Sequence, residues 1–131
     1  SLVRPYFHTE WPEAQKVNGI TPEMVAGAPY PHELLPQLVE IFSEMSVCIG
    51  YNTSFDLGFL DRIGIPTEHL TVIDVMQMFV DYLNANGGTR RRASLSTCTK
   101  HFDYQWEGAA HNSLADAKAT LYCYNMMKII K

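Results

Sequence analysis

Two aspartates and one histidine have the residue types and spacing of a metal-dependent site. His111 stands five residues ahead of Asp116 in the stretch HNSLADA, and Asp116 enters a long, mostly apolar segment. Asp56 lies in the stretch YNTSFDLGFL, shortly after a run of apolar residues. Carboxylates can hold divalent metal ions, and a nearby histidine can take a proton from a metal-bound water. The pattern therefore predicts a metal site formed by Asp56 and Asp116, with His111 as general base.

Each of these residues also has an ordinary structural interpretation. An aspartate in the first turn of a helix is favoured by the helix dipole alone, and a histidine before a helix is more often a simple loop residue. Asp74 is interpreted as a helix cap, and His8, His32, His69 and His101 as surface or packing residues. Spacing by itself leaves the catalytic and the structural interpretations open.

Three consecutive arginines, Arg90, Arg91 and Arg92, end a loop that contains Gly87 and Gly88. The glycines give this loop conformational freedom, and the arginines give it positive charge. Such a run is either a solvated loop or a clamp on the phosphates of a nucleic acid strand, and the sequence favours neither.

The elements around the first aspartate follow an α/β pattern. The apolar runs 47–50 and 70–73 are expected to form buried strands, the first covered on both faces. A helix capped by one of residues 52–54 follows the first strand, and Asp74 or a neighbour begins a helix after the second. This alternation predicts a parallel or mixed sheet flanked by helices.

The second aspartate belongs to the last helix, which is expected to be capped by Asn112 and to reach about Ile130. A shorter helix over 94–102 precedes it. Because ligands collect at the carboxyl ends of parallel strands, Asp56 and Asp116 are expected to converge at one end of the sheet.

The front of the chain predicts little regular structure. Residues 1–32 are rich in proline and aromatics and are interpreted as a strand end at Leu2 and Val3 followed by a loop with one-turn helices. An amphipathic helix follows over 33–45, where Pro36 is tolerable if it lies in the first turn. Two strands and one fragment are fewer than a stable sheet usually needs.

Composition narrows the class of protein. The chain of 131 residues is 47% hydrophobic and 18% charged, as expected for a single domain over 1–131. The net charge of -4 argues against indiscriminate coating of nucleic acid, and no apolar run is long enough to predict a membrane span. Three cysteines without ligand spacing predict neither a disulfide framework nor a zinc site, which fits a reducing, cytoplasmic location.

The two acidic stretches, in this order, resemble the DnaQ-like 3'-5' exonucleases of the DEDD superfamily, histidine subtype. The second acidic motif of that family, HN-x-x-FD-x-x-FL, is matched by residues 51–60, with Tyr51 in place of the usual histidine. The third motif, a histidine with an aspartate five residues later, is matched by His111 and Asp116. Further matches are LVRP at 2–5, NGITPEMV at 18–25, IDV at 73–75 and RASL at 92–95.

The resemblance implies a ribonuclease H-like fold with a mixed central sheet and removal of nucleotides from the 3' end of DNA or RNA. In that family four carboxylates hold two Mg²⁺ or Mn²⁺ ions, and Asp56 and Asp116 would be two of the four. His111 would be the general base. Asn52, Phe55 and the three arginines would contact the nucleic acid, and a DNA polymerase, as in polymerase III epsilon-like proteins, or another replication or repair protein would be the partner.

One departure from the family is serious. The first acidic motif, an Asp-x-Glu on the opening strand, does not occur in this sequence. We therefore expect an N-terminally incomplete domain that lacks the first strands and is weak or inactive as a nuclease. The alternatives are a non-catalytic nucleic-acid- or protein-binding remnant of the same fold, or an unrelated α/β interaction domain. An open sheet edge would also permit a dimer.

Overall fold

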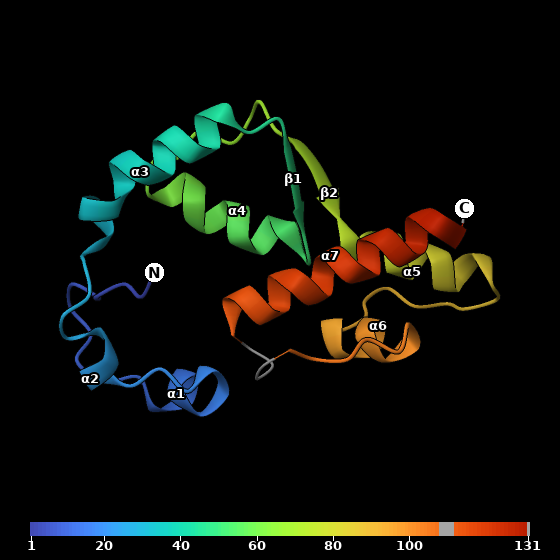
Figure 1. Cartoon of the computed structure of the whole chain (residues 1–131), viewed down its shortest axis with the longest axis horizontal. Coiled ribbons are helices and arrows are strands. Elements are labelled where there is room, and N and C mark those ends of the chain that lie inside the picture. Colours follow the sequence, from blue (N-terminus) through green and yellow to red (C-terminus); the bar gives the residue numbers. More distant parts are fainter. Residues whose placement is uncertain (108–111, 131) are drawn as a thin grey trace.

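The computed structural model describes residues 1–107 and 112–130, and within them the chain forms seven helices and two strands (Figure 1). His111 lies outside the described residues. In chain order the elements are α1 (Pro12–Asn18), α2 (Pro22–Val25), α3 (Pro31–Glu44), β1 (Val47–Gly50), α4 (Thr53–Arg62), β2 (Thr71–Asp74), α5 (Val75–Ala85), α6 (Leu95–His101) and α7 (Ser113–Ile130).

The two strands pair in parallel, which confirms the predicted α/β class. Val47 lies opposite Thr71, and Gly50 lies opposite Asp74. The two strands therefore end at the same edge of the sheet, where α4 and α5 begin directly after them. This arrangement brings the first turns of both helices to the carboxyl end of the sheet.

The expectation that β1 is covered on both faces is wrong. Val47 and Ile49 are 46% and 37% exposed, and Val72 on β2 is 41% exposed. A sheet of two strands is too narrow for the flanking helices to cover both of its faces. Leu2 and Val3 are also not part of a strand in the described residues.

Helix α3 begins two residues earlier than expected, at Pro31. A proline suits the first helical position, and the backbone N–H of Tyr30 donates to the Glu33 carboxylate at 2.7 Å. Pro36 consequently lies in the second turn and not in the first as predicted. The helix buries no residue fully, so its predicted apolar face is only partly covered.

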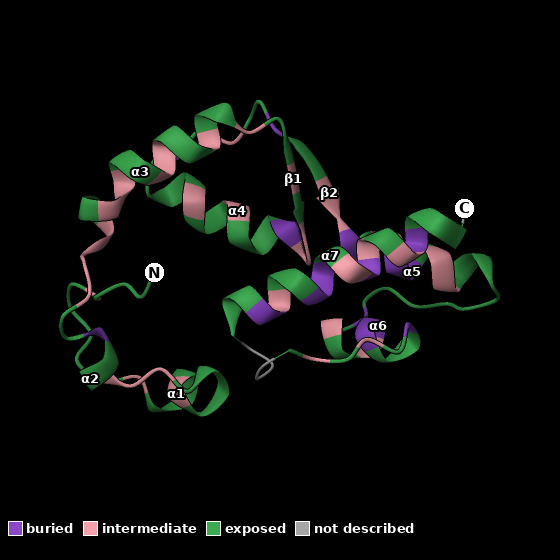
Figure 2. Cartoon of the chain, viewed as in Figure 1, coloured by how far each residue is buried: buried purple, intermediate pink, exposed green. Residues whose placement is uncertain are grey.

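The core is formed by α5, α6 and α7 (Figure 2). Phe79 of α5 is completely buried, and its ring centroid lies 5.8 Å from that of Phe102 at the end of α6. Cys98 of α6 and Cys123 of α7 are completely buried beside them. No helix in the described part of the chain has the length and apolar character needed to cross a membrane.

The two helices α6 and α7 begin close to the residues expected from the sequence. The Ser94 hydroxyl accepts from the Thr97 backbone N–H at 3.1 Å and caps α6. The Asn112 side-chain oxygen accepts from Leu114 and Ala115 at 3.1 and 3.3 Å and caps α7. The predicted Asn112 cap is confirmed, and Ser94, the expected first residue of the shorter helix, is its cap. Each side chain supplies an acceptor that the free N–H groups of a helix start require.

Candidate active site

Asp56 and Asp116 line the same pocket, which has a volume of about 430 Å³. Asp56 lies in the first turn of α4 and Asp116 in the first turn of α7. The pocket opens at the carboxyl end of β1. Its wall consists of Ile49, Gly50, Tyr51, Phe55, Asp56, Leu95, Ser113, Asp116, Ala117 and Thr120.

The position of Asp56 is set by the turn between β1 and α4. Asn52 adopts a left-handed conformation with φ 60° and ψ 50°, a region that asparagine enters more readily than most residues. The backbone N–H groups of Asn52 and Thr53 both donate to the Asp74 carboxylate at 3.0 Å. This turn directs the chain from the sheet edge into α4, so that Asp56 reaches the pocket.

Asp74 is a helix cap, as predicted, and also has a second role that sequence reasoning missed. Its carboxylate accepts from the backbone N–H of Met76 at 2.9 Å and of Gln77 at 3.4 Å, which caps α5. The same carboxylate caps α4, whereas the side chain of Asn52 makes no capping bond. The signal for this role is the place of Asp74 as the last residue of β2, opposite Gly50 and therefore beside the turn that begins α4.

Asp116 is positioned by the capped start of α7. Its backbone N–H donates to the Asn112 carbonyl at 2.9 Å, and its carbonyl accepts from the Thr120 hydroxyl at 2.8 Å. Thr120 is buried and also lines the pocket, so one turn of α7 forms this part of the wall. Asp116 itself is half-buried.

Two effects disfavour the charge of Asp56. Partial burial is the main cause and raises the pKa of its carboxyl; a backbone hydrogen bond lowers that pKa by less, and the negative charge of Asp74 adds a still smaller increase. A carboxylate in this situation would be stabilised by a bound cation. The raised pKa of Asp56 is therefore in the direction expected of a carboxyl group at a cation site when no cation is bound.

The carboxylate pocket offers two carboxylates to a divalent ion. The described residues contain no group of three or more His, Cys, Asp and Glu side chains that could hold a metal. Mg²⁺ is commonly bound through one or two protein carboxylates, with water and substrate phosphates completing its shell. Asp56 and Asp116 are the two carboxylate residues that line this pocket.

Phe55 of the pocket wall continues into a row of side chains along α4. Phe55 is 63% exposed, and its ring lies edge-on to Phe59 with 5.1 Å between centroids. The guanidinium of Arg62 lies 5.4 Å from the centroid of the Phe59 ring. Phe55, Phe59 and Arg62 thus follow one face of α4 outward from the pocket.

Tyr51 stands where the family pattern has histidine, and its hydroxyl donates to the Ala93 carbonyl at 2.9 Å. Burial, aided by the neighbouring thiols Cys98 and Cys123 and by Asp74, raises the pKa of Tyr51 well above its usual range. This phenol stays protonated at neutral pH. Its role is to hold the end of β1 against the segment that precedes α6, where Leu95 joins the wall.

The other predicted contact residues are not on the pocket wall. Asn52 lies behind the wall in the turn described above. Arg90, Arg91 and Arg92 are exposed, and their loop is pinned by Asn84, whose side chain bonds the backbone N–H and carbonyl of Arg90 at 2.8 and 2.9 Å. A phosphate clamp at these arginines stays a prediction, as does the role of His111.

The chain matches one protein family and is similar to several known proteins. Residues 6–124 match the model of a family described as Exonuclease. A Mycobacterium tuberculosis protein whose name describes a bifunctional exonuclease/endonuclease is 30% identical over 125 residues, which are 92% of this chain and 19% of that protein.

Two polymerase proteins are also similar. DNA polymerase III subunit epsilon of Pasteurella multocida is 34% identical over 74 residues, 51% of this chain and 29% of that protein. A PolC-type DNA polymerase III of Halalkalibacterium halodurans is 28% identical over 109 residues, 80% of this chain and 7% of that protein. The chain spans less than a third of the length of each of these relatives.

Proposed function

This chain belongs to the exonuclease family, and we propose that it is a 3'-5' exonuclease domain that hydrolyses the last phosphodiester bond at the 3' end of a nucleic acid. The observation that carries the proposal is that Asp56 and Asp116, far apart in the sequence, line one pocket at the carboxyl end of the sheet. The names of the polymerase III relatives support a nucleic acid substrate and a polymerase as partner.

In this proposal Asp56 and Asp116 hold Mg²⁺ or Mn²⁺. When bound, such an ion stabilises the charge that develops on the phosphate and acidifies the attacking water. His111, five residues before Asp116, accepts the proton of that water as general base. Phe55, exposed at the pocket mouth, contacts the terminal nucleotide, and Asn52, Arg90, Arg91 and Arg92 contribute contacts to the strand.

The second metal of the two-metal mechanism needs further carboxylates. In the resembling family they come from the Asp-x-Glu motif, which this sequence does not contain. We therefore propose that the chain by itself cleaves weakly, and that further polypeptide supplies the missing ligands. The open edges of the two-stranded sheet are a suitable place for such a segment or for a second copy of the chain.

Nuclease activity is tested with a single strand labelled at its 3' end, excess Mn²⁺ and the three variants Asp56→Asn, Asp116→Asn and Asp61→Asn. Asp61 lies on the same helix as Asp56 and is exposed, but it does not line the pocket, so it controls for lost charge. We expect release of nucleoside monophosphate to fall roughly 100-fold or more in the first two variants and to stay unchanged in the third.

Mn²⁺ binding gives a second readout that does not depend on turnover. It is measured as the decrease of the electron paramagnetic resonance signal of free Mn²⁺. Equal Mn²⁺ affinity and equal cleavage in all three variants would overturn the proposal. Strand binding without any release of monophosphate would instead favour a non-catalytic nucleic-acid-binding domain of the same fold. That alternative follows from the absence of the Asp-x-Glu motif from this sequence.

A further inference from the structure

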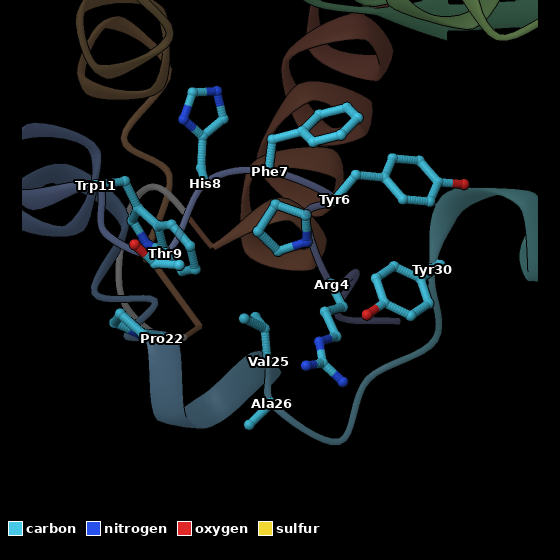
Figure 3. Close-up of a pocket in the computed structure, with 11 residues that line it drawn as sticks. Arg4, Tyr6, Phe7, His8, Thr9, Trp11, Pro22, Val25, Ala26 and Tyr30 are labelled. Atoms are coloured by element: carbon cyan, nitrogen blue, oxygen red, sulfur yellow. The ribbon is translucent and has the colours of Figure 1, made fainter.

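A second pocket, of about 230 Å³, lies in the N-terminal part of the chain and shares no residue with the carboxylate pocket (Figure 3). It lies between the segment 4–11, α2 and the start of α3. Its wall consists of Arg4, Pro5, Tyr6, Phe7, His8, Thr9, Trp11, Pro22, Val25, Ala26 and Tyr30. Pockets for drug-sized ligands begin at about 300 Å³, so this one suits a single flat ring system.

One side of the pocket carries a stack of rings. Tyr6 and Tyr30 are nearly parallel, with 5.3 Å between centroids and 4° between planes. His32 lies beside this pair and not on the pocket wall, with its ring centroid 5.8 Å from that of Tyr6 and 5.9 Å from that of Tyr30, and the Tyr6 hydroxyl is hydrogen-bonded to His32 Nδ1 at 2.6 Å. The stack is fixed in place before any ligand arrives, which lowers the entropy cost of binding.

Two further rings border the pocket. Phe7 is 92% exposed, although an aromatic ring of this size is usually covered in a folded protein. The indole N–H of Trp11 donates to the Ile20 carbonyl at 2.7 Å, which fixes the Trp11 ring at the wall. Phe7 thus offers an uncovered face, and its ring centroid lies 6.0 Å from that of Tyr6.

The charge of the pocket wall is positive. The guanidinium of Arg4 lies beside the Tyr30 ring (Figure 3), 5.1 Å from its centroid. The Arg4 backbone N–H donates to the Pro29 carbonyl at 2.9 Å. His8 is the other ionisable side chain apart from Tyr6 and Tyr30, and the described wall contains no aspartate or glutamate. Exposed aromatic rings interleaved with an arginine are the features that bind single-stranded nucleic acid.

We propose that this pocket binds one base of a single-stranded nucleic acid, with a neighbouring phosphate held by Arg4. The base stacks on Phe7 or on the adjacent rings, and the strand gains an anchor outside the carboxylate pocket. The choice of nucleic acid as the ligand rests on the function proposed above. The existence of the pocket and the arrangement of its rings are independent of that function. Stacking is tolerant of sequence, so we expect binding without strong base preference.

The test uses the whole chain and short fluorescein-labelled oligo(dT) and oligo(rU), with anisotropy measured in EDTA so that no metal is bound. We expect Phe7→Ala to weaken binding roughly 5- to 100-fold, the range found for loss of one stacked base. Because Phe7 is almost fully exposed, this substitution should leave the fold intact. Ile129→Ala is the control, since Ile129 is an apolar residue that is 78% exposed on α7.

Arg4 is tested through the salt dependence of binding. Loss of one phosphate contact to a single strand lowers the slope of log affinity against log salt by about 0.7. We expect this change for Arg4→Gln and no change of slope for Phe7→Ala. Lys16→Gln removes one positive charge from the same N-terminal region, but Lys16 does not line the pocket, so its slope should match the parent chain.

Trp11 supplies a local signal. In a Trp106→Phe background Trp11 is the single tryptophan, and oligonucleotide should quench its fluorescence. Failure of both oligonucleotides to bind, or equal binding by Phe7→Ala and the parent chain, would overturn the proposal. Binding that survives Asp56→Asn separates this site from the proposed nuclease site, so either can fail while the other stands. Preference for oligo(dT) or oligo(rU) then identifies the strand.

Discussion

A raised pKa at Asp56 is the local cost of placing a carboxyl group at the pocket wall. Partial burial and the nearby Asp74 both disfavour its charged form, yet the side chain is retained beside Asp116 in the same pocket. Residues with perturbed pKa values in a cleft are candidates for function, because the local arrangement opposes stability. The same shift gives a stability test that needs no substrate.

Asp56→Asn is expected to stabilise the metal-free protein at neutral pH. Below the ordinary pKa of 3.8 the carboxyl is protonated in the folded and unfolded states, so asparagine should have little effect. As the pH rises through the raised pKa of the folded state, the parent chain acquires an unfavourable charge that asparagine lacks. The stability gain should therefore appear across this interval and level off above it.

The measurement is urea denaturation in EDTA at a series of pH values, with Asp61→Asn as the control for lost charge on α4. A gain for Asp56→Asn that is already complete at pH 3, or a loss of stability at neutral pH, would show that the shift is not in the stated direction. Stabilisation together with lost Mn²⁺ binding would fit a side chain kept for its function.

At the scale of elements, one carboxylate joins two strand-to-helix connections. Asp74 accepts hydrogen bonds from Asn52 and Thr53 at the start of α4 and from Met76 and Gln77 at the start of α5. The Thr53 hydroxyl adds a further bond at 3.2 Å. The start of α4, and with it Asp56, is therefore positioned from the neighbouring strand.

Asp74→Ala is expected to lower the free energy of unfolding by about 2–4 kcal/mol, the sum of a lost helix cap and of donors left without an acceptor. Asp81→Ala is the matched control, because Asp81 is exposed on α5. Within the described part of the chain, its carboxylate accepts a hydrogen bond only from the Gln77 side chain. Urea denaturation measures both. If Asp74→Ala lowers the free energy of unfolding no more than the control does, within about 0.5 kcal/mol, then Asp74 does not stabilise the starts of both helices.

Burial is uneven over the whole molecule. The core residues belong to α5, α6, α7 and the segment just before α6, whereas α1 and α3 bury no residue and α2 buries Val25 (Figure 2). Figure 1 shows α1, α2 and α3 on one side of the molecule and α5, α6 and α7 on the other. Elements with few buried contacts open at low free-energy cost.

Hydrogen exchange should report this difference directly. The amides at the centres of α5 and α7 are expected to be protected up to the global free energy of unfolding, whereas those of α1 and α3 should exchange through local openings of about 0–2 kcal/mol. Exchange followed by mass spectrometry in peptides from each helix measures both groups. Equal protection in α3 and α7 would show that the N-terminal helices unfold together with the core.

Local patterns predicted most of the elements. The Ser94 and Asn112 caps, the parallel strands and the helix after Asp74 follow from short-range chemistry, since a helix start needs an acceptor within a few residues. The DnaQ-like resemblance is confirmed at the level of the exonuclease family. The predicted burial of β1 failed because burial depends on which other elements cover a strand, and a short apolar run does not contain that information.

The sequence by itself determined the residue types, their order and the positions at which helices begin, because these depend on neighbours along the chain. Only the tertiary structure decided that Asp56 and Asp116 share a pocket, that Asp74 caps two helices and that Tyr51 holds Ala93. These contacts join residues far apart in the sequence. Asp56 and Asp74 meet because parallel strands in register bring their carboxyl ends, and the helices that follow, to one edge of the sheet. Asp116 reaches that edge because α7 packs against β1.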